Sequence, residues 1–189
     1  MNQNLTGAFI GTRVEALQAL MHHTTVTSIL CIEGSRVHEF SIARNLPFKV
    51  LKRNDRGHAM NLIATLGEHI VLSAGFPWII DENTLNSVAG LKINSHPSKL
   101  PNFKGINSIR DALASGSDSL GVTVHYMTPE VDGGPIIIQE EFSIKGLSLP
   151  QIYELVFGRI EPKLITYALA MVTNQIVSDP KMNLRAELT

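Results

Sequence analysis

Asn94 and His96 are the densest pair of chemically useful side chains in the sequence. They lie in the segment Ile93-Asn94-Ser95-His96-Pro97-Ser98-Lys99-Leu100-Pro101. The two residues end a predicted strand, and side chains two apart in extended chain project to the same face. An amide and an imidazole then point into one pocket, where they can donate, accept and carry protons. The two prolines fix φ and remove backbone donors, so the loop cannot continue the sheet. A strand end with a simply hydrogen-bonded histidine is the alternative interpretation.

Two further segments carry side chains of interest. Asp132-Gly133-Gly134-Pro135 lies between two late predicted strands and is, on its own, typical of a turn. The segment from Ala74 to Ile80 contains the only tryptophan, Trp78, at the carboxyl end of another predicted strand. An aromatic loop there either packs into the core or forms the wall of a pocket for a flat ligand.

The sequence shows no pattern typical of a metal-binding site. The single cysteine, Cys31, excludes a disulfide framework and a cysteine-rich zinc site. His22, His23, His38, His58 and His69 show no spacing typical of a metal site. We expect a site without a metal.

The elements that must position these residues alternate along the chain. Strands are expected over residues 8–10, 26–32, 48–50, 69–73 and 91–94, and helices over 14–21, 58–66 and 107–114. Two later strands, 121–126 and 135–142, are joined by a loop short enough for an antiparallel pair. A long helix carries an apolar stripe from Ile152 to Met171, and Pro162 predicts a kink or restart within it.

This order predicts an α/β fold: a Rossmann-like, mostly parallel sheet with helices on both faces and an antiparallel C-terminal strand pair. Ligands in such sheets bind beyond the carboxyl ends of the strands, which points to residues 11–13, 74–80 and 94–101. We expect one catalytic domain over residues 1–177 and a C-terminal tail over 178–189.

Composition narrows the class of function. The formal net charge of −1 disfavours a nucleic-acid binder that neutralises phosphates. The N-terminus lacks the basic start and apolar run of a signal peptide, and the apolar run from Ile70 to Ile80 is too short for a membrane span. We therefore expect a cytoplasmic protein that does not bind nucleic acid or membranes.

The motifs in this order resemble the family of formyltransferases that use 10-formyltetrahydrofolate. This family includes phosphoribosylglycinamide formyltransferase, methionyl-tRNA formyltransferase and the amino-sugar formyltransferases. The resemblance spans roughly residues 6 to 172 and rests on two motifs at a specific separation. The matching residues are Asn94-Ser95-His96-Pro97-Ser98, Leu100-Pro101, Gly105, Gly121-Val122-Thr123-Val124-His125 and Val131-Asp132-Gly133-Gly134-Pro135.

The resemblance implies a catalytic set that falls on Asn94, His96 and Asp132. An amine attacks the formyl carbonyl and gives a tetrahedral oxyanion and a positive nitrogen. The Asn94 amide and the His96 ring would donate to the oxyanion. Asp132 would accept a proton, directly or through water, and keep His96 protonated. His125 is interpreted as a structural histidine.

The resemblance also implies 10-formyltetrahydrofolate as formyl donor, no metal, and a pterin held between two loops. It further suggests a cis peptide bond at Leu100-Pro101. The implied folate-binding residues are Phe76, Pro77, Trp78, Ile79 and Ile80 in one loop and Thr128, Pro129, Glu130 and Val131 in the other.

The acceptor is a small-molecule amine, and we favour a nucleotide-linked amino-deoxysugar. The glycinamide enzymes carry a glycine-rich loop with Ser and Asn that cradles the substrate phosphate, whereas this chain has Gly11-Thr12-Arg13-Val14-Glu15. The segment from Thr123 to Met127 resembles the amino-sugar enzymes best. The residues expected to contact the acceptor are Thr12, Arg13, Ser98 and Asn107, with the basic segment 49–56 as a further candidate for a pyrophosphate.

Other acceptors and roles stay open. Phosphoribosylglycinamide is the alternative acceptor, supported by the compact length and the Asp-Gly-Gly-Pro segment. A tRNA acceptor is disfavoured because the residues after Val172 are too few for the further β-barrel domain of the methionyl-tRNA enzymes. A formyl-folate hydrolase or a folate-binding relative is a third possibility. A homodimer is one of the open oligomeric states.

Overall fold

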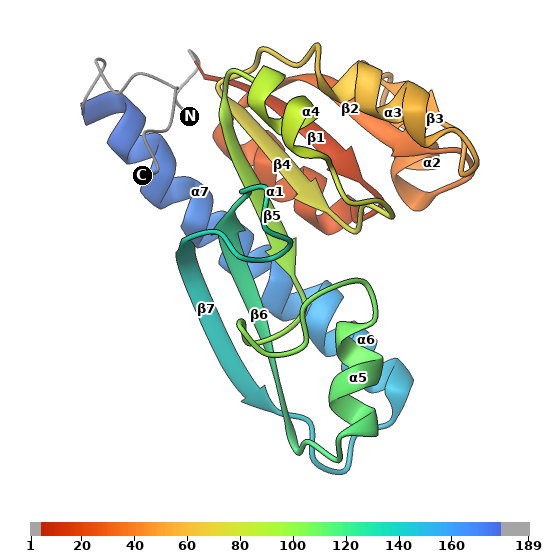
Figure 1. Cartoon of the computed structure of the whole chain (residues 1–189), viewed down its shortest axis with the longest axis vertical. Helices are drawn as coiled ribbons and strands as arrows, with labels where there is room; N and C mark the ends of the chain where they lie inside the picture. Colours follow the sequence, from red (N-terminus) through yellow and green to blue (C-terminus); the bar gives the residue numbers. More distant parts are fainter. Residues whose placement is uncertain (1–4, 179–189) are drawn as a thin grey trace.

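The computed structural model describes residues 5–178, which form seven strands and the helices around them (Figure 1). The strands are β1 (Thr6–Gly11), β2 (Thr25–Ile32), β3 (Lys49–Leu51), β4 (Ile70–Ala74), β5 (Leu91–His96), β6 (Ser119–Tyr126) and β7 (Ile136–Ser143). The helices are α1 (Val14–His23), α2 (Arg36–Ala43), α3 (Arg56–Ile63), α4 (Glu82–Ser87), α5 (Ser108–Ala114), α6 (Leu149–Leu155), the π-helix η1 (Val156–Ile160) and α7 (Glu161–Ser178).

The strands form one sheet in the order β3-β2-β1-β4-β5-β6-β7. Strands β1 to β5 pair in parallel, and β6 and β7 run antiparallel to their neighbours. The predicted fold class is therefore confirmed. The chain builds outward from β1 to β3 and then returns to start β4 on the other side of β1. The carboxyl ends of β1 and β4 thus form the topological switch point, where such sheets bind ligands.

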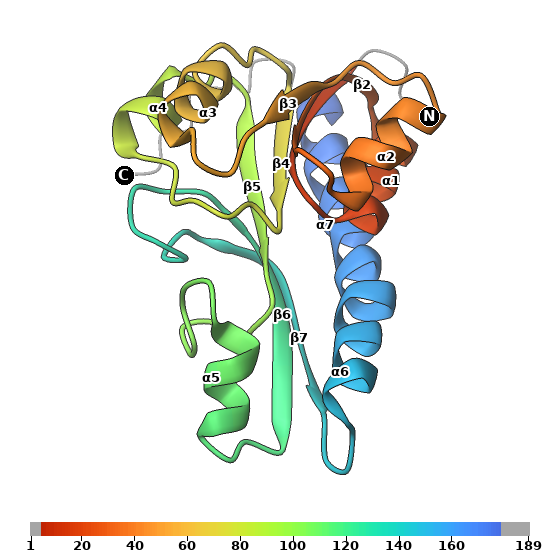
Figure 2. The ribbon, with the colours of Figure 1, turned by 90° about the vertical axis from the view of Figure 1, so that its right-hand side faces the viewer.

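Helices cover both faces of the sheet, as Figure 2 shows with α3 and α4 on one side and α1, α2 and α7 on the other. Alternate residues of one strand enter different cores, because successive side chains point to opposite faces. Phe9 packs into the core beneath α1 and α7, while its neighbours Ala8 and Ile10 pack into the core beneath α3. A sheet buried on both faces explains the continuous apolar runs of β1, β2 and β4.

Two helices were not predicted from the sequence. Helix α2 starts at a Ser35 cap and α4 at an Asp81 cap, and each cap accepts a hydrogen bond from a backbone N–H of the first turn. Both helices are short; α4 contains a single apolar residue, and α2, although half apolar, buries only Val37 and Ser41, so neither shows a clear apolar stripe. The caps were the available signals.

The C-terminal helix departs from regular geometry just before Pro162, as expected. Its residues 156–160 form the π-helix η1, and α7 continues from Glu161. Pro162 has no N–H to donate to the preceding turn, and a widened turn accommodates that loss. Helix α7 ends at Ser178, so the rest of the predicted tail, 179–189, lies outside the described residues. The domain boundary at residue 177 stays a prediction.

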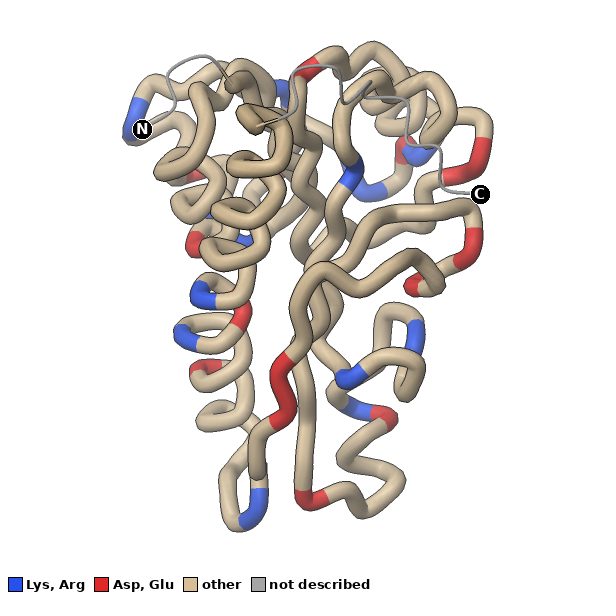
Figure 3. The backbone as a smooth tube through the Cα atoms, turned by 90° about the vertical axis from the view of Figure 1, so that its left-hand side faces the viewer, with Lys and Arg blue, Asp and Glu red and all other residues tan. Residues whose placement is uncertain are grey.

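Acidic and basic residues are interspersed over the fold rather than gathered in one stripe (Figure 3). Within residues 5–178, no helix is both long enough and apolar enough to cross a membrane.

Candidate active site

The candidate site lies at the carboxyl ends of β1, β4 and β5, where a cavity of about 320 Å³ opens. The loop after β4 is tied to the loop after β1: the Thr12 amide donates to the Ala74 carbonyl (3.1 Å) and the Thr12 hydroxyl to the Gly75 carbonyl (3.0 Å). Gly75 has a φ of +69°, and a Cβ there would lie 2.7 Å from the Thr12 hydroxyl. Only glycine fits this close turn without strain.

Asn94, His96 and Asp132 meet in this cavity. The spacing predicted a shared pocket for Asn94 and His96, and the family resemblance added Asp132. Asn94 and His96 both lie within β5, which extends two residues further than expected. His96 Nδ1 lies 3.4 Å from a carboxylate oxygen of Asp132, and its Nε2–H donates to the Phe103 carbonyl at 2.9 Å. Both ring nitrogens thus face protein acceptors, so His96 can donate to a substrate only by exchanging one of these partners.

His125 belongs to the same cluster, which sequence reasoning did not anticipate. Strand β6 pairs antiparallel with β5 and places His125 directly opposite Asn94. The Asn94 amide nitrogen lies 3.3 Å from His125 Nε2, which lies 3.6 Å from Asp132. His125 Nδ1–H donates to the Tyr126 carbonyl (2.8 Å), which leaves Nε2 to face the Asn94 amide. The signal available in the sequence was His125 within the strand that leads into the Asp132 loop.

A strained turn aims Asp132 at the two histidines. Asp132 has a left-handed φ of +48°, and its carboxylate accepts a hydrogen bond from the Gly105 amide at 2.8 Å. A Cβ on Gly134 would overlap the carbonyl of Tyr126, so the return to β7 needs glycine there. The Asp-Gly-Gly sequence is thus a turn and also the device that places a carboxylate.

Opposing effects set the charges in the cluster. Burial lowers the pKa of His96, and the charge of Asp132 and the Phe103 carbonyl offset only part of that effect. Burial alone would raise the pKa of Asp132, but the hydrogen bond to His125, the charge of His96 and the Gly105 amide outweigh it and lower the pKa. Both shifts therefore favour the ionised form of Asp132 and the neutral form of His96.

An apolar wall faces this cluster. Phe76 and Trp78 pack edge to face with ring centroids 5.3 Å apart, while Ile79 and Val131 leave 61% and 37% of their surface exposed. Arg56 braces the wall by donating to the Ile79 carbonyl at 3.0 Å. The nine residues predicted to bind folate all line the cavity: Phe76, Pro77, Trp78, Ile79, Ile80, Thr128, Pro129, Glu130 and Val131.

The four residues predicted to contact the acceptor are placed differently from one another. Arg13 lines the main cavity and also a second cavity of about 310 Å³, which Asn107 lines too. The Thr12 hydroxyl and amide both donate hydrogen bonds to the segment at the end of β4. Ser98 is fully buried and donates to the Asn102 carbonyl at 2.6 Å, so the structure does not bring it to either cavity.

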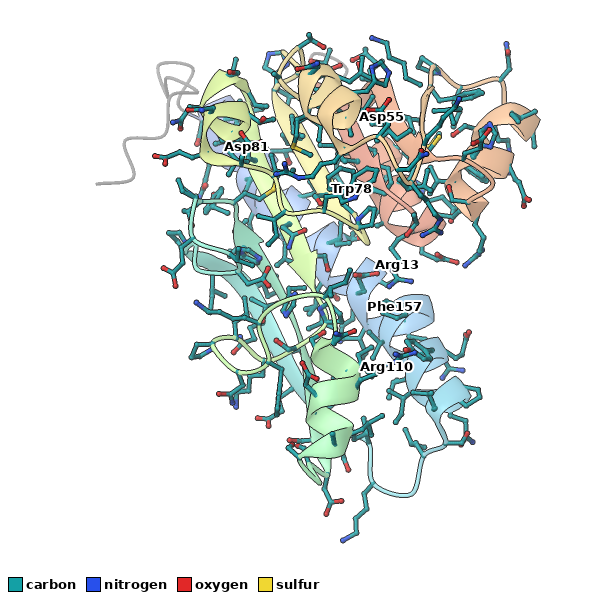
Figure 4. All side chains as sticks on the ribbon, turned by 45° about the vertical axis from the view of Figure 1, so that its right-hand side comes forward. Arg13, Asp55, Trp78, Asp81, Arg110 and Phe157 are labelled. Atoms are coloured by element: carbon teal, nitrogen blue, oxygen red, sulfur yellow. The ribbon has the colours of Figure 1, made fainter. Side chains whose placement is uncertain are left out.

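The second cavity adjoins the first through Arg13 and Phe157. The Arg13 guanidinium stacks on the Phe157 ring, 3.4 Å above its centroid. Arg110 on α5 and Tyr153 on α6 line the far side, and Figure 4 shows Arg110 below Phe157 along the same side of the molecule. Arg13 and Phe157 are among the residues that line both cavities.

The Leu100-Pro101 peptide bond is cis, as expected. Within residues 5–178, no cluster of three or more His, Cys, Asp or Glu side chains is arranged to hold a metal ion. In the basic segment 49–56, only Arg56 contacts a wall of the main cavity, through Ile79.

Comparison with known proteins places the chain in a family. The family described as "Formyl transferase" matches residues 33–156. A phosphoribosylglycinamide formyltransferase from Haemophilus influenzae is 25% identical over 71% of this chain and 69% of its own. A methionyl-tRNA formyltransferase from a Thermotoga species is 27% identical over 74% of this chain and 42% of its own. The chain spans less than half the length of most of the sequence relatives it matches.

Solved structures with a similar fold include proteins of the same name. The crystal structure of glycinamide ribonucleotide transformylase 1 from Symbiobacterium toebii superposes with a TM-score of 0.80 at 20% identity, covering 93% of this chain and 90% of that one. An open α/β sheet of this kind, with its candidate site at the carboxyl ends of the strands, is the fold of these transferases. The chain belongs to the formyl transferase family.

Proposed function

We propose that this protein transfers the formyl group of 10-formyltetrahydrofolate to the primary amine of a small, phosphate-bearing acceptor, and that phosphoribosylglycinamide is the acceptor. One observation carries the proposal. The main cavity runs from the apolar wall past Asn94, His96 and Asp132 to Arg13, where the second cavity begins. This layout offers a formyl donor and an amine separate ends of one site.

The wall fits the formyl donor. A pterin is flat and apolar on its faces and polar at its edge, and the wall offers Trp78, Ile79 and Val131 beside loop backbone groups. Ile79 and Val131 are exposed apolar side chains that a bound ring would cover.

The cluster suits acyl transfer. The amine nitrogen bonds to the formyl carbon, the bond from that carbon to the folate nitrogen breaks, the amine loses one proton and the folate nitrogen gains one. Asn94 gives one amide hydrogen to His125, and its second is available for the oxyanion. His96, between Phe103 and Asp132, is placed to hold positive charge as the oxyanion develops.

Two arginines favour a phosphate on the acceptor. Arg13 and Arg110 line the second cavity, and among the described residues that line it none is acidic. Guanidinium groups bind phosphate with paired, charge-assisted hydrogen bonds. The names of the Haemophilus and Symbiobacterium proteins support phosphoribosylglycinamide over the amino sugar that the first loop favoured.

A nucleotide-linked amino-deoxysugar is the second candidate acceptor. The observation that favours it is the engagement of Thr12: its amide and hydroxyl both donate to the loop after β4, so they do not form a phosphate cradle after β1. A phosphate in the second cavity would lie beyond Phe157 as seen from the candidate catalytic residues. The two acceptors differ in the distance between their amine and their phosphate, so that distance distinguishes them.

The proposal is tested by initial rates with 10-formyltetrahydrofolate and a panel of amines, following release of tetrahydrofolate by absorbance. The panel contains phosphoribosylglycinamide, nucleotide-linked amino-deoxysugars and a control without amine. Turnover that depends on phosphoribosylglycinamide supports the proposal. Turnover with one amino sugar alone selects the second candidate, and turnover without amine identifies a formyl-folate hydrolase instead.

A further inference from the structure

Glu161 is a buried acid that lines the main cavity, and one of its two carboxylate oxygens has no hydrogen-bond partner. Only 1% of its side chain is exposed, and Oε1 accepts a hydrogen bond from the Ser95 hydroxyl at 3.0 Å. Oε2 is buried and has no hydrogen-bond partner. Glu161 lines the cavity together with Arg13, Ser95 and Phe157.

The nearest cation does not satisfy this oxygen. Arg13 Nε lies 4.0 Å from Oε2 and is itself buried without an acceptor. The guanidinium is held by its stacking on Phe157 instead of closing onto the carboxyl. A buried charged group without a hydrogen-bond partner costs folding free energy. Such groups are therefore usually paired directly with each other or through a bridging molecule. Arg13 Nε and Glu161 Oε2, which lie side by side in the cavity wall without partners, are therefore suited to binding a polar group of a ligand.

The position of Glu161 relates it to the reacting groups. Ser95 lies between Asn94 and His96 on β5, so its hydroxyl projects to the other face of the strand, where α7 packs. The cavity is lined by residues from both faces. Glu161 therefore lies across the end of β5 from Asp132, on the side where Arg13 leads to the second cavity.

This end of the cavity is also where the chain goes beyond its family match. The matched segment ends at residue 156 and begins at residue 33. Arg13, Phe157 and Glu161 all fall outside it, whereas Asn94, His96 and Asp132 fall within it. Residues at this end of the cavity are suited to recognising the acceptor, because specificity in a shared fold is carried by the residues of the site.

We infer that Glu161 binds the amino group of the acceptor, with Oε2 accepting its hydrogen bond and taking the proton that the ammonium must lose before it attacks. One proton moves from the amine nitrogen to Oε2, leaving a neutral amine and a neutral carboxyl group held by Ser95. The inference rests on the proposed function and adds the residue that selects and activates the amine.

The electrostatics support this role. Burial raises the pKa of Glu161 to about 7, with the charge of Arg13 and the Ser95 hydroxyl lowering it and Glu15 on α1 raising it further. Asp132, in contrast, has a lowered pKa and is a weak proton acceptor at neutral pH. A base works best when its pKa lies near the working pH.

The test uses Glu161→Gln, which keeps an oxygen for Ser95 and cannot accept the proton, and Glu161→Asp as the conservative variant. Glu140→Gln is the matched control, because it removes a carboxylate that pairs with Lys163 and lines neither cavity. Rates are measured from pH 5.5 to 9 with the amine that the panel identifies. We expect Glu161→Gln to raise KM for the amine and lower kcat, each at least tenfold, with KM for 10-formyltetrahydrofolate within twofold of wild type.

The pH profile separates this role from a structural one. Wild type and Glu140→Gln should lose kcat/KM for the amine below about pH 7, and Glu161→Gln should lack that acidic limb. Glu161→Asp should restore part of the activity and the limb. An unchanged profile and amine KM in Glu161→Gln would overturn the inference and leave the proposed function standing. Absence of amine-dependent turnover in wild type would reject the proposed function and this inference with it.

A readout without turnover complements these rates. In protein labelled with ¹³C at the glutamate carboxyl carbons, the signal missing from Glu161→Gln should titrate near pH 7. A midpoint below pH 5 would overturn the inference, since such a carboxylate would not take a proton from the amine at neutral pH.

Discussion

Replacing Asp132 with Asn tests whether its charge serves the reaction. The substitution keeps the size and the acceptor for the Gly105 amide but removes the negative charge 3.4 Å from His96. Two unit charges at that distance interact by about 5 kcal/mol at an effective dielectric constant of about 20. If His96 gains about half a charge in the transition state, roughly 2 to 3 kcal/mol is lost, which corresponds to about 10²-fold in kcat.

The measurement is the amine-dependent rate of tetrahydrofolate release at pH 7.5, with Asp118→Asn as the control. Asp118 lies far along the sheet, is 72% exposed and pairs only with Lys145 through its side chain, so its rate should equal that of wild type. Both variants should show unchanged KM for 10-formyltetrahydrofolate. If Asp132→Asn kept more than a tenth of the wild-type kcat, the electrostatic reasoning would be refuted.

Three further predictions concern the two ends of the site and the buried acid. Arg110→Ala should raise KM for a phosphate-bearing acceptor about tenfold without changing KM for the formyl donor; an equal rise in both constants in steady-state kinetics would contradict a phosphate site at this arginine. Ile79→Ser should raise KM for 10-formyltetrahydrofolate several-fold and leave the melting temperature within about 2 °C, because its side chain is 61% exposed; an unchanged KM would remove Ile79 from the folate wall. For Glu161, a folded-state pKa of about 7 against an ordinary 4.5 means that the folded state holds the proton more tightly, so this stabilisation is complete below pH 4.5 and lost as pH rises through 7. Between pH 4.5 and 8, the free energy of unfolding in urea should therefore fall by on the order of 3 kcal/mol more in wild type than in Glu161→Gln. If the free energy of unfolding changed with pH equally in the two proteins, the carboxyl would not be held protonated.

The fold was predictable because its cores are simple in sequence. A parallel sheet buried on both faces produces continuous apolar runs, and β1, β2 and β4 stood out for that reason. The short helices α2 and α4 were missed because neither is long enough to show a clear apolar stripe and their caps are single residues.

The cluster of Asn94, His96, His125 and Asp132 was predictable only in part. Asn94 and His96 share a strand, so the two-residue repeat alone places them together. His125 reaches them through the register of β5 against β6, which a sequence without its pairing partner does not specify.

The acceptor end was the least predictable. Ser98 was expected to face the substrate but is buried against Asn102, because the loop turns after Pro97. Phe157 and Glu161 fall within the predicted long helix and were not singled out from the sequence. Their role at the cavity depends on how the helix from α6 to α7 crosses the sheet, which is set by tertiary packing rather than by local pattern.

The central claim is that the formyl carbon moves from folate to an amine. The most direct measurement supplies 10-formyltetrahydrofolate labelled with ¹³C at the formyl carbon, together with phosphoribosylglycinamide, and follows the label by NMR. We predict that the label appears in a formamide of the amine, at a rate equal to that of tetrahydrofolate release. Label that appears as formate, or stays on the folate with every amine of the panel, would contradict the account.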